Sequence, residues 1–411
     1  MGDEPKEGRK RRRRWPWWLG GTVVLLLLLF FGGGGWYFSS KIRSDALAVD
    51  DQAPPEYVHE VLEAGEGRIV LALGDDPPRD LTADEIIGIR WPGGYGQADA
   101  ILEQDDTRIV RSFRVIEGAP PPVGDPIALD GYAYPEDPAA ISVPPGCLAC
   151  HGDGGFTVPA PEEVSYSSAF GEFDSLLFSG SEDTWVIFVH GRGAHVREGF
   201  RLLPVTAALG YPSLLVDYRN DEGEPATESR LGTFGAEEWE DLEGAVRFAL
   251  DRGAADVVLA GASMGGAIAV SFLEQSDLAG RVDGIVLDAA ALELGAMVDA
   301  RAGDTALLPG LPIKVPIVLT ATAKTISSWR FGVDWGAIDY LDRIGEVGVP
   351  VLLFHGTDDT TVPVALSDEA AETLGARATY LRVDGAEHVR SWNADPVGYS
   401  HALAEFLRSV G

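Results

Sequence analysis

Six short apolar segments recur through the second half of the sequence, and helix-like stretches separate them. The segments are residues 185–189, 213–216, 257–260, 284–287, 351–354 and 380–383, and the separating stretches include 237–250 and 366–374. Alternation of this kind predicts a mostly parallel β-sheet covered by helices on both faces. We therefore expect an α/β domain over residues 181–411.

A longer insertion interrupts this alternation between the fourth and fifth predicted strands, at residues 291–349. It contains the aromatic residues Trp329, Phe331, Trp335 and Tyr340. We predict that it forms a lid over an apolar pocket.

The motif Gly261-Ala262-Ser263-Met264-Gly265 lies directly between the third predicted strand and a helix-like stretch. Small residues on both sides permit a strained turn that lifts the serine hydroxyl clear of the sheet. A glycine-rich packing turn would look similar, but the strand before the motif and the helix after it favour a nucleophile. We therefore predict that Ser263 is nucleophilic.

A serine nucleophile needs a general base, and the base needs a carboxylate that orients it. His388 follows the last predicted strand, and Asp358 and Asp359 follow the strand before it. The chain order of serine, acid and histidine is the one that this type of turn requires. Asp288, at the end of the fourth predicted strand, is an alternative acid.

With these motifs, the segment from about residue 184 to 409 resembles the α/β-hydrolase superfamily, and especially its membrane-associated bacterial serine hydrolases. The resemblance implies an α/β-hydrolase fold. It also selects Asp359 over Asp358, because the family's acid lies four residues after the histidine of a His-Gly turn and three before a Val-Pro pair. The expected catalytic residues are therefore Ser263, Asp359 and His388.

A tetrahedral intermediate also needs hydrogen-bond donors for its oxyanion. The backbone N–H of Met264, directly after the nucleophile and at the start of a helix, is the first predicted donor. The second is expected in the loop after the first strand, and the resemblance implies the backbone of Arg192. Alternatively, the glycines of that loop only make a tight turn. The Arg192 guanidinium could in addition hold the polar end of a substrate.

Residues 17–38 contain no charged side chain. At 1.5 Å per residue, about 22 residues span about 33 Å, which is enough to cross a bilayer core. Aromatic residues at both ends suit the two interfaces, and the arginine cluster before the segment predicts a cytoplasmic N-terminus. We expect a basic cytoplasmic tail (1–16), one transmembrane helix (17–38) and a linker (39–56), with the catalytic domain outside the cytoplasm.

A cleaved signal peptide is the competing interpretation, because Ala46-Leu47-Ala48 resembles a cleavage site. However, Lys41 and Arg43 intervene, and the apolar segment is longer than that of a typical signal peptide. We therefore predict a single-pass protein of the cell membrane.

Between the linker and the α/β domain, residues 57–180 contain short β-like runs separated by Pro, Gly and Asp. They predict a small β-rich accessory domain. We expect little catalytic content there.

Charge is distributed unevenly along the chain. Residues 1–43 carry nine basic and three acidic residues, whereas the whole chain has a net charge of −32, so that the remainder carries −38. Such an acidic surface repels phosphate, and this excludes nucleic acid as a partner.

The only two cysteines form the motif Cys147-Leu148-Ala149-Cys150-His151, which matches c-type haem attachment. The rest of a cytochrome is hard to find, because Met297, far along the chain, is the only methionine left as a candidate axial ligand of the haem iron. A local disulfide in an oxidising compartment is the interpretation we favour. We expect neither a cofactor nor a metal ion.

Taken together, these features predict a membrane-anchored serine hydrolase that acts on small carboxylic esters. A peptide or aminoacyl amide is the alternative substrate, and the β-rich segment before the hydrolase domain favours it modestly. A cell-envelope binding protein on a retained hydrolase fold and a haem-dependent redox protein are two further hypotheses.

Overall fold

The structure is a computed structural model that describes residues 17–49, 54–65, 67–141, 147, 157–307, 310 and 312–411. The chain forms two compact units. One contains the N-terminal helical segment up to Ala46 together with Ala302–Val333, and the other contains Leu47–Arg301 and Asp334–Gly411. The predicted cytoplasmic tail, residues 1–16, lies outside the described residues.

The larger unit contains an eight-stranded sheet with the strand order β14-β13-β12-β11-β9-β10-β8-β7. The strands β9 to β14 are parallel to one another, and β8 pairs antiparallel with β10 and with β7. The parallel strands are β9 (Thr184–Val189), β10 (Ser213–Val216), β11 (Asp256–Ala262), β12 (Val282–Asp288), β13 (Val351–Gly356) and β14 (Ala378–Val383). The predicted parallel sheet is confirmed.

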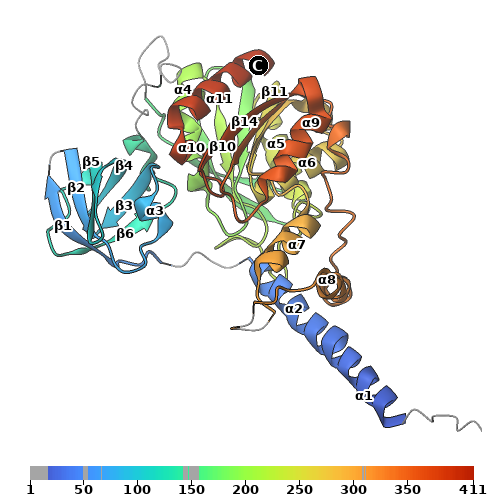
Figure 1. Cartoon of the computed structure of the whole chain (residues 1–411). Helices are drawn as coiled ribbons and strands as arrows, with labels where there is room; N and C mark the ends of the chain where they lie inside the picture. Colours follow the sequence, from blue (N-terminus) through green and yellow to red (C-terminus); the bar gives the residue numbers. More distant parts are fainter. Residues whose placement is uncertain are drawn as a thin grey trace, which may run out of the picture. The chain divides into compact units, whose positions relative to one another are not determined.

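Helices cover both faces of this sheet (Figure 1). On one face α4 (Leu203–Leu209) contacts α11 (Pro396–Val410), and on the other α5 (Trp239–Asp251) contacts α6 (Met264–Gln275). The central strands are buried on both sides, which explains why they read as continuous apolar runs. The α/β-hydrolase fold is therefore confirmed.

The β-rich accessory region is a closed six-stranded barrel with the strand order β1-β2-β5-β4-β3-β6. Its strands are β1 (His59–Gly65), β2 (Gly67–Ala72), β3 (Ile87–Trp91), β4 (Gly94–Gln104), β5 (Arg108–Gly118) and β6 (Pro126–Asp130). Alternate apolar residues such as Ile69, Leu71 and Ile109 are fully buried in its interior. Closure removes the unpaired sheet edges that so small a domain would otherwise expose.

The boundary expected near residue 180 is corrected by the strand pairing. β7 (Glu162–Ser167) and β8 (Glu172–Phe178) fall within the range predicted for the accessory domain, yet they extend the larger sheet. Alternating apolar residues show that a segment is a strand, but they do not show which sheet it joins.

The N-terminal helix runs without a break through α1 (Trp17–Leu27), a π-helical segment (Leu28–Gly34), α2 (Gly35–Ile42) and a second π-helical segment (Arg43–Leu47). From Gly20 to Leu47 it is long and apolar enough to cross a membrane. The expected linker over residues 39–56 is corrected, because the helix continues to Leu47. Leu47 and Val49 are then buried, since alternate apolar side chains here pack into the larger unit.

Two of the consecutive glycines in this helix lie where a second helix crosses it. The α8 helix (Ile317–Phe331), from the middle of the insertion 291–349, contacts α2 within the smaller unit. A Cβ at Gly35 would lie 2.8 Å from the Thr322 Cγ2 atom and 2.9 Å from the Ile326 Cδ1 atom. Any side chain at Gly35 would therefore force Thr322 and Ile326 to shift. The proposed lid over a pocket stays a prediction.

Replacing Gly35 by Val is expected to separate α8 from α2, because Thr322 and Ile326 occupy the space that the new side chain needs. Trypsin should then cleave the full chain in detergent several-fold faster after Lys324 and Arg330. Gly33→Val is the matched control, because a Cβ there meets nothing within 4 Å. Equal cleavage of the two variants would contradict this close contact between α8 and α2.

Candidate active site

Ser263 occupies a sharp turn between β11 and α6. Its backbone has φ 50° and ψ −117°, a left-handed conformation that a non-glycine residue rarely adopts. Neighbouring glycines permit the turn, because a Cβ at Gly265 would lie 2.0 Å from the Val189 carbonyl oxygen, and one at Gly261 would lie 2.4 Å from the Gly265 carbonyl carbon. The Ser263 N–H donates to the Asp288 carbonyl at 2.9 Å, which ties the turn to β12.

The structure brings the three predicted catalytic side chains into one hydrogen-bonded row. His388 Nδ1 lies 2.7 Å from Asp359 Oδ2, and His388 Nε2 lies 3.0 Å from Ser263 Oγ. A carboxylate only accepts hydrogen bonds, so Nδ1 donates to Asp359, and in the neutral ring Nε2 is then free to accept from the serine hydroxyl. This is the protonation state in which a histidine can act as a general base toward serine.

Asp359 is held on both of its oxygens. Its Oδ1 accepts hydrogen bonds from the backbone N–H groups of Thr361 and Val362, both at 2.8 Å. Its Oδ2 faces His388 and also His355 Nε2 at 3.2 Å. Burial raises the pKa of Asp359, but hydrogen bonds from His355 and His388 outweigh burial and hold the pKa well below its usual value. The carboxyl therefore stays ionised.

The alternative acid, Asp288, has a different partner. It is buried on β12, and its ion pair runs to Arg201 Nη1 at 3.5 Å. The Arg201 side chain also donates to the Val389 carbonyl at 2.7 Å, next to His388. Arg201 therefore supports the histidine loop, and no motif in the sequence indicated it.

The two predicted oxyanion residues lie near the turn. Met264 is the first residue of α6, directly after Ser263. In the loop after β9, a Cβ at Gly191 would lie 3.2 Å from Ser263 Cβ, so that this loop passes beside the serine. The Arg192 guanidinium donates to the carbonyl of Ala48, in the segment that follows the N-terminal helix. The Arg192 guanidinium is thus already hydrogen-bonded within the chain.

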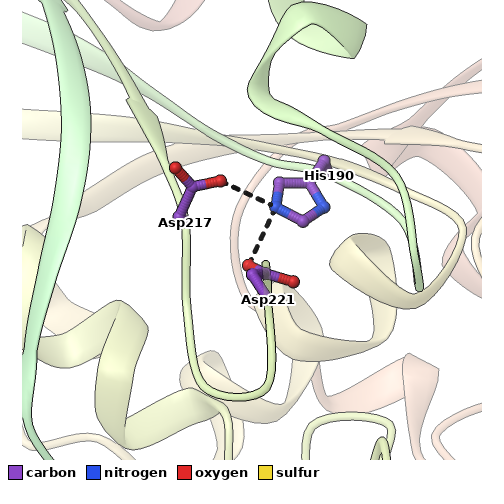
Figure 2. A group of neighbouring side chains, drawn as sticks. All are labelled: His190, Asp217 and Asp221. Atoms are coloured by element: carbon purple, nitrogen blue, oxygen red, sulfur yellow. Dashed lines mark hydrogen bonds and ion pairs between the residues drawn. The ribbon is translucent and has the colours of Figure 1, made fainter. Parts of the chain in front are cut away.

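A second polar cluster lies at the start of that loop and consists of His190, Asp217 and Asp221 (Figure 2). His190 Nε2 is 3.1 Å from Asp221 Oδ2 and 3.4 Å from Asp217 Oδ1, while Nδ1 is 2.8 Å from the Gly191 carbonyl oxygen. Both ring nitrogens therefore face acceptors. Burial lowers the pKa of His190, but the two carboxylates more than offset this and hold the pKa well above its usual value.

The ligand atoms of this cluster lie within 4.8 Å of one another, a spacing that a metal ion could use. A metal would need an unprotonated ring nitrogen. The three acceptors around His190 favour the doubly protonated imidazolium instead, and Tyr218 N–H already donates to Asp221 Oδ2 at 2.7 Å. The cluster is accounted for as a buried cation that fixes the loop between Gly191 and Gly193.

The cysteine motif lies away from this row of side chains in sequence. Cys147 is buried and forms a disulfide. Cys150 and His151, the other members of the predicted motif, lie outside the described residues.

Residues 186–402 match a family described as the alpha/beta hydrolase family. Solved structures that are similar to this chain include an esterase from Pyrococcus furiosus, which is 20% identical, with 61% of this chain and 92% of that chain covered and a TM-score of 0.47. An esterase from Rhodococcus sp. is 19% identical, with 61% of this chain and 99% of that chain covered and a TM-score of 0.39. A thermophilic esterase from Thermogutta terrifontis is 18% identical, with 61% of this chain and 99% of that chain covered and a TM-score of 0.43. No curated protein matches the sequence significantly.

The His190 cluster predicts a pH-dependent stability. Because the folded pKa of His190 lies above the ordinary value of 6.5, its contribution is fully present below that pH and is lost as the pH rises through the folded pKa. His190→Gln is expected to lower the free energy of unfolding by about 3 kcal/mol near pH 6, since it leaves two carboxylates without their cation. Urea unfolding of the full chain at about pH 6 and about pH 9 measures both effects.

In the His190→Gln variant, this decline in stability toward high pH should be smaller than in the parent. The matched control is His401→Gln, because His401 lies on the exposed side of α11. If His190→Gln lost the same free energy at both pH values, His190 would be neutral in the folded protein.

Proposed function

The chain belongs to the α/β-hydrolase family, and we propose that it is a membrane-anchored serine hydrolase that cleaves small carboxylic esters through an acyl-enzyme. Ser263, His388 and Asp359 would form its catalytic triad. The observation that carries this proposal is the row of two hydrogen bonds, 2.7 Å and 3.0 Å long, that joins the three side chains.

In the proposed reaction, Ser263 Oγ attacks the ester carbonyl while His388 Nε2 takes the hydroxyl proton. Collapse of the tetrahedral intermediate breaks the bond to the alkoxy group, and His388 returns the proton to the departing alcohol. Water then attacks the acyl-enzyme by the same route, which releases the acid and restores Ser263. Asp359 holds the imidazole in the required tautomer and stabilises its protonated form.

The oxyanion would be held by the backbone N–H groups of Met264 and Arg192. The position of Met264 at the first turn of α6 supports its role, because free N–H groups and the helix dipole both favour negative charge there. The closeness of Gly191 to Ser263 Cβ supports a donor from the neighbouring residue.

The proposal includes the topology. The helix from Gly20 to Leu47 would cross the cell membrane, with the basic residues 1–16 in the cytoplasm and the barrel and hydrolase domains outside. The boundary between the barrel and the hydrolase domain would lie between residues 131 and 161. Residues 291–349 would be an insertion of the hydrolase domain. The substrate is expected to be small, and nucleic acid is not expected as a partner.

Ser263→Ala is expected to lower kcat/KM for aryl esters by at least about a thousandfold, because the nucleophile is lost. Asp359→Asn should lower kcat by about ten-thousandfold, because an amide favours the wrong histidine tautomer. Asp368→Asn, at a surface ion pair of the same domain, should stay within about twofold of the parent. Steady-state kinetics of the full chain in detergent measures all three.

An organophosphonate should label the parent at Ser263, whereas Ser263→Ala should remain unlabelled. Ester turnover that survives in Ser263→Ala would overturn the triad. Aminoacyl anilides assayed in parallel decide the substrate, because anilide turnover as efficient as that of esters would replace the esterase proposal by a peptidase.

A further inference from the structure

The outward surface of α8 differs from the rest of this acidic chain. Ile317, Val318 and Trp329 are 73%, 53% and 78% exposed, and Ala321 and Thr325, which lie between them, are exposed as well. These positions follow one another at helical spacing and contain no charged residue. An exposed helix stripe without charge is unusual on a protein in water and indicates a partner.

The charge of this segment is also unusual. Residues 305–333 contain three cations, Lys314, Lys324 and Arg330, and no carboxylate, although the chain as a whole carries −32. A basic segment with an apolar stripe fits an anionic lipid surface, where cations meet headgroups and apolar side chains enter the acyl boundary.

The helix that α8 crosses supplies the continuity with a membrane. Figure 1 shows α8 crossing the N-terminal helix at a steep angle, and both lie in one compact unit. The Arg330 guanidinium lies 3.8 Å from the centre of the Trp36 ring, and the Trp36 and Trp329 rings are 6.2 Å apart. Tryptophan and arginine together are typical of the headgroup level, where apolar and polar surroundings meet.

We propose that the outward stripe of α8 lies in the headgroup region of the bilayer that the N-terminal helix crosses, where the positive charge of residues 305–333 favours anionic lipids. This rests on the proposed membrane anchor. It gives the insertion a second role, which is to hold the hydrolase at the surface of a lipid phase. Among small esters, such a position favours those whose acyl group is apolar enough to partition into the membrane.

Fluorophore labelling at three positions tests this placement. Leu27→Cys, Val318→Cys and Arg247→Cys are each labelled with an environment-sensitive fluorophore, in full chains reconstituted into vesicles of phosphatidylcholine and phosphatidylglycerol. All three positions are exposed, so the substitutions leave packing intact. Lipids that carry a quencher should quench the fluorescence of labels at positions 27 and 318. The emission of the label at position 318 should also shift to the blue, whereas that of the label at position 247 should be unaffected.

Quenching at position 27 without quenching at position 318 would overturn the α8 placement and keep the anchor. Absence of quenching at both positions would overturn the anchor and the placement together. A label at position 318 that is shielded from an aqueous quencher, yet not reached by quencher lipids, would show that protein covers the stripe, and this also overturns the proposal.

A second observation concerns Arg79, on the short helix α3 (Arg79–Thr82) of the barrel region. Its Nη1 donates to Glu85 Oε1 at 2.7 Å, which fixes the guanidinium. Its Nη2 donates to the Gly385 carbonyl and lies 3.5 Å from Asp358 Oδ2, and its Nε lies 3.4 Å from Glu387 Oε1. One guanidinium thus bridges two loops of the hydrolase domain.

These two loops carry the proposed acid and base. Asp358 directly precedes Asp359, and Glu387 directly precedes His388. Without a cation between them, the carboxylates of Asp358 and Glu387 would repel each other and separate the loops. A displacement of about 1 Å at the reacting groups can lower a rate by about a hundredfold.

Further bonds from the barrel region reinforce this contact. Arg390, two residues after His388, donates to Asp80 Oδ2 and to the Gly131 carbonyl, both at 2.8 Å. Asn393 Nδ2 donates to the Ile86 carbonyl at 2.8 Å, and the Ile86 N–H donates back to the Asn393 carbonyl at 2.8 Å. The barrel region therefore contacts the histidine loop both before and after the proposed base.

We infer that Arg79 is a positioning residue, through which the barrel holds the acid and histidine loops in register. This rests on the proposed function. In the full chain, Arg79→Ala should lower kcat for aryl esters by about tenfold to a hundredfold and leave KM nearly unchanged. Arg79→Lys keeps the charge without the fork and should recover part of kcat.

Arg68→Ala is the matched control, because Arg68 pairs with Glu63 on an exposed part of the same barrel and should keep the parent kcat. Urea unfolding midpoints of all variants separate misfolding from misplacement. Ser263-dependent turnover with equal kcat in the parent and Arg79→Ala would overturn the role of Arg79 alone. A fall in kcat that is matched by an equal rise in KM, and that Arg79→Lys does not reverse, would also overturn it, because that pattern shows general damage.

Discussion

The left-handed backbone at Ser263 is the constraint on which the geometry of the site depends. A non-glycine residue in such a conformation costs about 1–3 kcal/mol and persists only where the surroundings fix it. Here the turn is fixed by the bond from Ser263 N–H to β12 and by the close approach of Gly265 to the Val189 carbonyl on β9. Three neighbouring parallel strands therefore define where the hydroxyl lies. The loops that carry His388 and Asp359 extend from the next two strands, at the same edge of the sheet, so strand order alone brings the three groups together.

Local compensation of buried charge is the second feature that unites the structure. An acidic chain must keep carboxylates apart or supply each buried one with a partner. Asp359 is held by two histidines and two backbone N–H groups, and the pair Asp217 and Asp221 by the His190 imidazolium. The charged groups of the site thus each have specific neighbours. The need for such neighbours explains why a separate barrel, through Arg79, can influence loops that it does not itself contain.

The sequence predicted those features that local patterns encode. The parallel sheet follows from apolar runs, and the turn at Ser263 follows from glycines at fixed spacing, so the structure confirms the fold and brings Ser263, Asp359 and His388 together. Their catalytic roles stay predictions. Partners distant in sequence could not be predicted, because a pattern around Arg79 or Arg201 carries no information about the loop that each contacts. For the same reason, the pairing of β7 and β8 with the larger sheet and the crossing of α8 over α2 became visible only in three dimensions.

The segment directly after the N-terminal helix bears on whether that helix is removed. Leu47 and Val49 are buried, Ala48 forms a bridge with Leu231, and the Ala48 carbonyl accepts a hydrogen bond from the Arg192 guanidinium. A cut after Ala48 would delete the strand partner of the chain around Leu231 and would release the side chain of a proposed oxyanion residue. Buried backbone that pairs with the core contributes to the stability of the folded domain, and its loss leaves polar groups without partners. These contacts favour an uncleaved helix, because residues 47–49 then serve both as the end of the proposed anchor and as part of the hydrolase domain.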